Sequence, residues 1–207
     1  MIAVIDYGMG NLRSVVKAVE CVGGQARIIS EPDGVLAADK IILPGVGAFA
    51  DAMTHLRERN LVEPLKQVIA ADRPLLGICL GLQLLFDVGY EDGEHAGLGV
   101  LGGKVVRFDF TGRPEAAGLS IPHMWWNTLA WDRPDPMLSG VEPGSYVYFV
   151  HSYHVVPDDP AVEATSTEYG YRFTSAVRRG NLFASQFHPE KSQGVGLRMV
   201  ENFVKGG

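Results

Sequence analysis

The sequence contains few cysteines, no long hydrophobic run and no cluster of basic residues. It has two cysteines, and its 18 Lys and Arg against 24 Asp and Glu give a formal net charge of −6. Two distant cysteines form neither a disulfide framework nor a zinc-ligand spacing, which fits a reducing compartment. The lack of a basic patch argues against nucleic-acid binding, and no apolar run approaches the ~20 residues of a membrane span. We therefore expect a globular protein of the cytoplasm.

The first half of the chain alternates between short apolar runs and segments with helical spacing. Residues 1–6 lack the basic region of a signal peptide and are typical of a buried strand. Further strands are expected at 25–29, 40–43 and 75–78, and helices at 12–22, 49–56 and 61–70. This alternation predicts an α/β fold with a central, mostly parallel sheet and helices on both faces. Cys21 completes the first helical pattern and is expected in the core.

After about Gly97 the pattern changes to strands separated by turn signals. We expect strands at 100–108, 124–131, 146–154, 161–168, 175–177 and 182–186, then a helix at 194–204. Because few helical segments intervene, these strands are predicted to be antiparallel and partly to extend the central sheet. No linker or repeat divides the chain, so we interpret residues 1–207 as one domain; the alternative is a domain boundary near Gly93.

The segment Gly77-Ile78-Cys79-Leu80-Gly81 follows an apolar run and precedes a helical pattern of leucines. Glycines two positions on either side of Cys79 permit a tight turn that raises its side chain above the sheet. A helix N-terminus beside the sulfur stabilises the reactive thiolate. The pattern predicts a nucleophilic cysteine, whereas a lone cysteine is more often simply a buried part of the core.

A base for this nucleophile is found far downstream, in Phe187-His188-Pro189-Glu190. Pro189 disfavours helix at His188 and favours extended backbone, in which residues two apart point the same way. His188 and Glu190 are therefore expected on one face, with the carboxylate orienting the imidazole. Together with Cys79 they predict a Cys-His-Glu triad for acyl transfer.

These two motifs resemble those of class I glutamine amidotransferases, in which a cysteine releases ammonia from glutamine through a thioester. Other segments resemble the glutaminase subunits of imidazole glycerol phosphate synthases, and the resemblance runs along the whole chain. These segments are 6–12 (DYGMGNL), 44–49 (PGVGAF), 122–124 (PHM), 126–127 (WN), 148–153 (YFVHSY) and 188–192 (HPEKS). The family implies a glutaminase in histidine biosynthesis that needs no cofactor and no metal.

Further site residues are implied in the same way. A tetrahedral oxyanion needs preorganised donors, and elbow geometry supplies the backbone N–H of Leu80. The family places a second oxyanion element in the loop formed by Gly45, Val46 and Gly47. For binding of glutamine it implies Gln83, Glu91, His151, Ser152 and Tyr153. Without the family, Gln83 and Glu91 would be interpreted as solvent-exposed polar residues.

The loop at residues 45–50 also matches the G-x-G-x-x-A fingerprint of dinucleotide-binding folds. It stands between a predicted strand and a predicted helix, as the fingerprint requires, and Glu63 follows at about the spacing of a ribose-binding acid. Glu63, however, lies within a helical pattern and not at the end of a second strand. We therefore favour an oxyanion loop over a nucleotide site.

His151 and His154 are three positions apart in a tyrosine-rich strand. Strand alternation places them on different faces, so we expect packed histidines and no metal site. The run Met124-Trp125-Trp126-Asn127 has polar neighbours, and an exposed aromatic cluster of this kind is typical of an interface.

The family implies a partner for this interface, a (β/α)-barrel cyclase that receives ammonia without its release into bulk water. That cyclase makes imidazole glycerol phosphate and aminoimidazole carboxamide ribonucleotide. The implied contacts are Asn11, Trp126 and Lys191, while Trp125 stands where the family commonly has glycine. The sequence contains no cyclase half, so we expect a heterodimer with a separate subunit. The alternatives are service to another synthase, or a non-catalytic binding subunit with the same fold.

Overall fold

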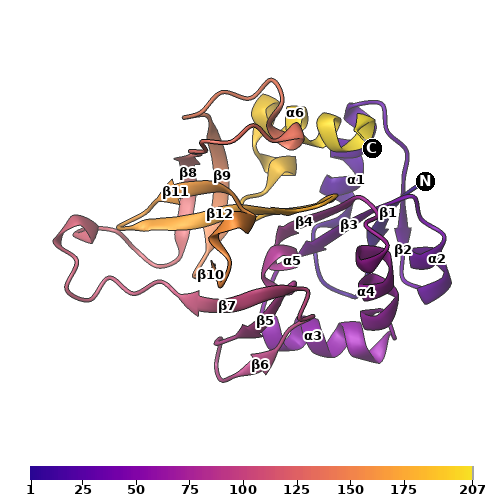
Figure 1. Ribbon diagram of the computed structural model, residues 1–207, viewed down its shortest axis with the longest axis horizontal. Coiled ribbons are helices and arrows are strands. Elements are labelled where there is room, and N and C mark those ends of the chain that lie inside the picture. The colour runs from indigo at the N-terminus through magenta and orange to yellow at the C-terminus, as the bar shows by residue number, and fades with distance from the viewer. Residues whose placement is uncertain (207) are drawn as a thin grey trace.

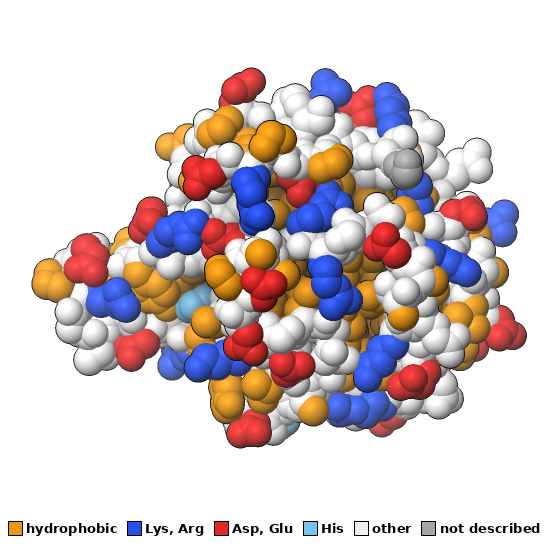
Figure 2. Space-filling view, viewed as in Figure 1, with side chains coloured by type: hydrophobic (Ala, Val, Ile, Leu, Met, Phe, Trp, Pro, Cys, Tyr) orange, Lys and Arg blue, Asp and Glu red, His pale blue; other side chains and the backbone are white. Residues whose placement is uncertain are grey.

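The computed structural model describes residues 1–206, and Gly207, the last residue of the expected domain, lies outside the described residues. A mixed sheet of eleven strands runs through the molecule, and a two-stranded sheet lies beside it (Figure 1). On the face shown in Figure 2, basic and acidic side chains are interspersed and neither sign dominates.

Five parallel strands form one half of the large sheet, in the order β2-β1-β3-β4-β13. Their bounds are Ile2–Ile5 (β1), Ala26–Ile29 (β2), Lys40–Gly45 (β3), Leu75–Cys79 (β4) and Leu182–Ser185 (β13). β1, β3, β4 and β13 are almost wholly buried, as strands covered on both faces must be. The predicted parallel strands of the first half are confirmed.

The sheet continues from β13 through β12, β10, β7, β5 and β6, and β11 is added on β12. All of these neighbours are antiparallel except the pair of β5 and β7. Two further strands, β8 and β9, form the separate antiparallel sheet. The bounds are Phe86–Gly89 (β5), His95–Ala96 (β6), Leu101–Arg107 (β7), His123–Thr128 (β8), Tyr146–His151 (β9), Tyr153–Pro157 (β10), Glu163–Glu168 (β11) and Arg172–Arg179 (β12). The predicted antiparallel second half is confirmed.

Helices cover both faces of the sheet and enclose two hydrophobic cores (Figure 1). α2, α3 and α4 contribute to one core, and α1 and α6 to the other. The bounds are Leu12–Cys21 (α1), Pro32–Leu36 (α2), Phe49–Glu58 (α3), Val62–Ala70 (α4), Leu80–Gln83 (α5) and Gln193–Lys205 (α6). Short 3₁₀ turns occur at Pro114–Ala116 (η1), Pro136–Leu138 (η2), Pro160–Val162 (η3) and Pro189–Lys191 (η4). None of the helices within residues 1–206 combines the length and hydropathy needed to cross a bilayer.

The expectation that Cys21 lies in the core is wrong, because Cys21 is exposed. The buried residues of α1 are Val15, Ala18 and Val19. Their spacing defines one helical stripe, and the last position of the helix falls outside it.

The helix expected after Cys79 is much shorter than its leucines suggest. α5 ends at Gln83, and the chain enters β5 three residues later. Leu82, Leu84, Leu85 and Phe86 are all buried. A stretch that is buried on every side carries no amphipathic period, so its apolar residues did not distinguish a helix from a turn followed by a strand.

The register of the parallel strands brings three loops to one edge of the sheet. Gly45 pairs with Cys79 at the ends of β3 and β4, and Ile78 pairs with Ser185 at the ends of β4 and β13. The segments that follow are the glycine loop, the cysteine turn and the segment of His188. Ligands of open α/β sheets bind at this edge, beyond the carboxyl ends of the strands.

Candidate active site

Cys79 occupies the turn between β4 and α5 in an unfavourable backbone conformation. Its φ of 55° and ψ of −109° lie where residues with a Cβ are rare. The side chain is buried, yet it lines a pocket. The predicted elbow is thus present, and its strain is confined to the residue that carries the thiol.

The two glycines around Cys79 are required by close packing. A Cβ on Gly81 would lie 1.9 Å from Leu43 O, and one on Gly77 would lie 2.8 Å from the Cβ of Ala184. Neither glycine has a positive φ, so the need is for space and not for a left-handed backbone. The absence of both side chains lets α5 approach β3 and lets β4 approach β13.

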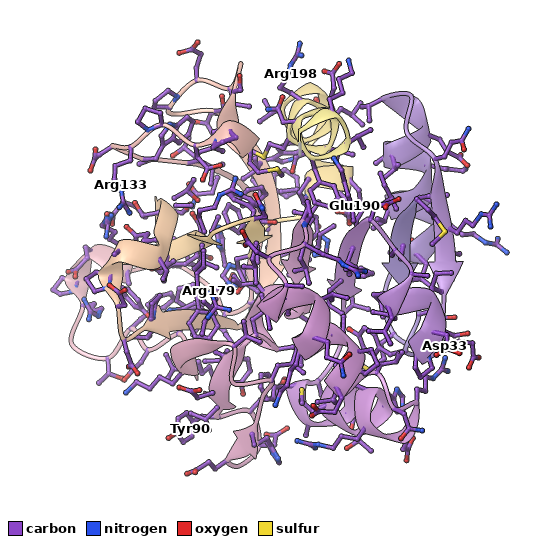
Figure 3. The ribbon with its side chains drawn as sticks, turned by 45° about the vertical axis from the view of Figure 1, so that its right-hand side comes forward. Asp33, Tyr90, Arg133, Arg179, Glu190 and Arg198 are labelled. Carbon is purple, nitrogen blue, oxygen red and sulfur yellow. The ribbon has the colours of Figure 1, made fainter. Side chains whose placement is uncertain are left out.

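His188 and Glu190 form a buried pair at the segment after β13. His188 Nδ1 donates to Glu190 Oε1 over 2.8 Å, and both side chains are only 2% exposed. Figure 3 shows Glu190 inside the molecule near the base of α6, away from the outlying Arg133 and Tyr90. His188 has the predicted extended backbone, and a 3₁₀ turn begins at Pro189. The other ring nitrogen, His188 Nε2, is buried and has no hydrogen-bond partner among the described residues. His188 also lines the pocket of Cys79.

Electrostatics favour a charged His188 ring. Burial opposes the charge, but Cys79 and Glu190 outweigh it and raise the pKa of His188 from 6.5 to about 10. A raised histidine pKa beside a thiol and a carboxylate indicates that the His188 ring is the charged imidazolium at neutral pH.

This pairing predicts a change in pH dependence when Cys79 is replaced by alanine. Because the folded-state pKa of His188 exceeds 6.5, the charged ring's contribution to stability is complete below pH 6.5 and is lost as the pH rises towards 10. Cys79→Ala removes the strongest attraction on the ring, so we expect His188 to titrate about one pH unit lower or more. Histidine NMR between pH 5 and 10 measures this midpoint. An unchanged midpoint would show that sulfur and ring do not interact.

A pocket of about 390 Å³ opens in front of Cys79. Cys79 and His188 line it, together with Leu80, Val46 and Gly47 from the expected oxyanion elements. All of the residues expected to bind glutamine line it too, namely Gln83, Glu91, His151, Ser152 and Tyr153. Gly45 stands behind this wall, where a Cβ would meet the hydroxyl of Tyr7 at 2.5 Å. These residues come from five separate segments of the sequence and meet at one cavity.

Gln83 and Glu91 are held by protein groups and are not free surface residues. One Glu91 oxygen accepts from the Phe49 backbone N–H over 2.7 Å, at the N-terminus of α3. Gln83 Nε2 donates to Tyr153 O and to Gln186 Oε1 over 3.2 and 3.1 Å. Both side chains enter the pocket with fixed orientations.

The expectation that His151 and His154 lie on different faces is wrong. Both rings pack against Phe108, with centroids 5.2 and 4.8 Å from it. The strand pattern breaks at Ser152, where β9 ends and β10 begins, so strict alternation does not extend from one histidine to the other. In the described part of the chain, no three His, Cys, Asp or Glu side chains are placed to hold a metal ion.

His151 belongs to a directed hydrogen-bond chain. Its Nδ1 donates to Tyr153 O over 2.7 Å, its Nε2 lies 3.0 Å from His123 Nδ1, and Asn127 Nδ2 lies 3.3 Å from His123 Nε2. Burial lowers the pKa of His123 to about 4 and that of His151 well below its ordinary value, so both rings are neutral. Because Tyr153 O is a carbonyl and only accepts, His151 Nδ1 carries the hydrogen and His151 Nε2 accepts from His123 Nδ1. His123 Nε2 in turn accepts from Asn127 Nδ2.

Two buried residues at the site were not singled out from the sequence. The Tyr7 hydroxyl donates to Pro44 O over 2.9 Å and holds the start of the glycine loop. Gln186 is fully buried, and its Nε2 donates to Cys79 Sγ over 3.7 Å. Gln186 has a sequence signal, because it is a polar side chain within the apolar run that leads to His188. Tyr7 has no comparable signal.

The expected interface residues lie close to the pocket. Trp126 and Lys191 flank Tyr148, whose ring is 6.0 Å from the Trp126 ring and 5.9 Å from Lys191 Nζ. Asn11 is exposed at the start of α1, which packs against η4. Trp125 is 70% exposed and Met124 57% exposed. β8 therefore carries exposed apolar and aromatic side chains, as the aromatic run predicted.

Comparison with known proteins gives one consistent result. The family model described as "Glutamine amidotransferase class-I" matches residues 3–206. "Imidazole glycerol phosphate synthase subunit HisH" of Syntrophotalea carbinolica is 52% identical over 98% of this chain and 98% of the relative. The protein of the same description from Rhodopirellula baltica is 53% identical over 99% of this chain and 97% of the relative.

Solved structures with low sequence identity share the fold. A structure described as that of a glutamine amidotransferase has a TM-score of 0.73 at 19% identity, over 98% of this chain and 99% of the other. The structure of PurLQS from Thermotoga maritima has a TM-score of 0.70 at 18% identity, over 98% of this chain and 94% of the other. The predicted fold class is therefore confirmed.

Proposed function

The chain belongs to the class I glutamine amidotransferase family, and from this premise we propose how its site works. It is a glutaminase, and its function is that of the glutaminase subunit of imidazole glycerol phosphate synthase in histidine biosynthesis. Identity of about half the residues over nearly the full length of these relatives supports this assignment. We place the reaction in the cytoplasm.

Cys79 is the nucleophile of the proposed reaction. Its thiolate attacks the side-chain amide carbon of glutamine, and a C–S bond forms as the carbonyl oxygen becomes an oxyanion. The His188 imidazolium gives its proton to the leaving nitrogen, so the C–N bond breaks and ammonia departs. Neutral His188 then takes a proton from water, whose oxygen attacks the thioester. Glutamate leaves, and the thiolate and imidazolium are restored.

The remaining pocket residues bind and orient in this proposal. Glu190 holds the His188 ring and stabilises its charge. The backbone of Leu80 and of the loop Gly45, Val46 and Gly47 stabilises the oxyanion. The amine and carboxylate of glutamine are bound by Gln83, Glu91, His151, Ser152 and Tyr153.

The observation that carries the proposal is the meeting of two independently built elements in one pocket. The strained turn presents Cys79 from β4, while the neighbouring strand β13 leads to His188 with its buried carboxylate. A structural cysteine requires neither the strain nor a buried ring nitrogen without a partner.

We assign the partner surface to the exposed aromatic residues of β8 and to the neighbouring Lys191. Met124 and Trp125 expose apolar area, and Trp126, on the same face of β8 as Met124, packs against Tyr148, which Lys191 also approaches. Asn11 is the third expected contact. The partner is the separate cyclase subunit, which receives ammonia directly. Trp125 is exposed in this chain and packs into no core, so contact with the cyclase would bury its large aromatic side chain.

The test is glutamate release by this chain alone, with the cyclase subunit, and with the cyclase and its nucleotide ligand. We expect low activity alone and an increase of at least about a hundredfold in the full mixture, since lids and loops that must be ordered commonly limit turnover. Equal activity in all three mixtures would retain the glutaminase but remove the gating by this partner. No activity in any mixture would contradict the glutaminase itself.

A further inference from the structure

A fully buried amide lies against the sulfur of Cys79. Gln186 has no solvent exposure, and its side chain has two polar partners, Gln83 and Cys79. Its Nε2 lies 3.7 Å from Cys79 Sγ, within hydrogen-bond range for sulfur. The glutaminase chemistry described above assigns no role to this side chain.

The orientation of the Gln186 amide follows from its neighbours. Tyr153 O is a carbonyl and only accepts, so the side chain of Gln83 must turn its NH₂ towards it. The same NH₂ group donates to the side chain of Gln186 over 3.1 Å. The oxygen of Gln186 must therefore face Gln83. The NH₂ group of Gln186 is left facing the sulfur.

Tyr153 O, the acceptor from which these hydrogen bonds start, is itself held in place. Tyr153 O also receives the Nδ1–H of His151, whose ring is held in turn by His123. Two donors converge on this one oxygen, and a flipped Gln83 would place two oxygens against each other there. The donor direction towards Cys79 is thus set by a backbone carbonyl on the far side of the pocket.

An N–H group aimed at sulfur favours one of its two protonation states. A thiol is a weak acceptor, whereas a thiolate accepts strongly, and charge-assisted hydrogen bonds are about twice as strong as neutral ones. The carbonyl that would accept from a thiol, Val150 O, lies farther from Sγ, at 4.0 Å. Unlike His188, an amide does not titrate, so its effect persists when the imidazole is neutral.

We propose that Gln186 is a catalytic residue that donates its side-chain N–H to the Cys79 sulfur and stabilises the thiolate, with Gln83 and Tyr153 O fixing its direction. The inference rests on the proposed nucleophilic role of Cys79. It adds to the triad a neutral donor on the reacting atom. It also gives Gln83 a positioning role, since Gln83 orients the Gln186 amide whether or not glutamine is bound.

The experiment measures how fast iodoacetamide alkylates Cys79 between pH 5 and 10. This reaction forms a C–S bond as iodide leaves, needs the thiolate, and requires neither glutamine nor a partner. A Cys21→Ser background leaves Cys79 as the single thiol. Gln186→Met keeps a similar volume and removes the donor, and Gln67→Met makes the same exchange at an exposed position of α4. The other titratable side chains around Sγ and the pocket stay unchanged: His188, Glu190, Tyr7, His151, Tyr153 and Glu91.

In Gln186→Met we expect the pH at which alkylation reaches half its maximal rate to rise by about one unit. The rate at pH 6.5 should fall about tenfold, which is the typical effect of losing a hydrogen bond to a charged group. Gln67→Met should match the reference chain. Gln186→Glu still accepts from Gln83 but opposes a thiolate, so its midpoint should lie higher still. A Gln186→Met profile that coincides with the reference would overturn the proposal and leave Gln186 as a packing residue.

A second measurement does not depend on the folding of any Gln186 variant. In the reference chain, the side-chain NH₂ resonances of Gln186 should shift with pH along the alkylation curve of Cys79. In Cys79→Ala this shift should disappear. Resonances that are insensitive to pH in the reference chain would also contradict the proposal. Failure of the proposed function would appear differently, as glutamate release that survives Cys79→Ala.

Discussion

Replacing Cys79 with alanine is expected to reduce glutamate release by about 10⁴-fold or more, because removal of a nucleophile from a working triad has effects of this size. The substitution removes Sγ alone. Alanine retains the Cβ that makes a φ of 55° unfavourable, so the turn keeps both its shape and its strain. Glutamate release in the mixture with the cyclase is the measurement.

Cys21→Ala is the matched control for this prediction. It makes the same exchange at the exposed end of α1, outside the core and the pocket. Its activity should equal that of the unchanged chain, and thermal melting should show both variants folded. If Cys79→Ala retained activity within tenfold of the control, the nucleophile would have to be another group.

A second large effect is expected from Gly81→Ala. The new Cβ would lie 1.9 Å from Leu43 O, a backbone atom that cannot rotate away. α5 would have to move away from β3, and Cys79, the residue just before α5, would move with it. Overpacking of this kind lowers the free energy of unfolding by about 1–3 kcal/mol, and a displacement of about 1 Å at a reacting group costs about a hundredfold in rate. Glutamate release and chemical unfolding measure the two effects.

Gly194→Ala provides the control, since a Cβ at that position meets nothing within 4 Å and its backbone is helical. Alanine is the better helix former, so this variant should be as stable as the unchanged chain or slightly more stable. Full activity in Gly81→Ala would mean that the close approach of α5 to β3 does not position the sulfur.

Local patterns predicted those parts of the site that depend on local geometry. The glycines around Cys79 indicated a tight turn, although in the structure they provide space for packing against Leu43 and Ala184. Pro189 indicated that His188 and Glu190 share a face. Both features need only a few neighbouring residues, and the structure shows both. The alternation of apolar runs and helical spacing likewise indicated the parallel half of the sheet.

Local patterns did not predict which strands lie side by side; the grouping of Cys79 with His188 was predicted from residue chemistry and from the family resemblance, not from periodicity. Nothing near Cys79 indicates that β13 lies beside β4, a pairing that brings Gln186 within reach of the sulfur. The short length of α5 also has a distant cause, because the strand that follows it, β5, is held by pairing with β7. Periodicity describes which face of an element is apolar, and it does not identify the element against which that face packs.

The strand order of the large sheet has a consequence for the synthesis of the chain. β13, the last of the described strands in chain order, is inserted between β4 and β12 in the middle of the sheet. Until residues 182–185 emerge, β4 and β12 each expose an unpaired edge, and edges of this kind promote aggregation. The same late strand delivers His188. A growing chain therefore carries Cys79 long before it carries His188, and the pocket that both residues line is complete only when β13 joins the sheet.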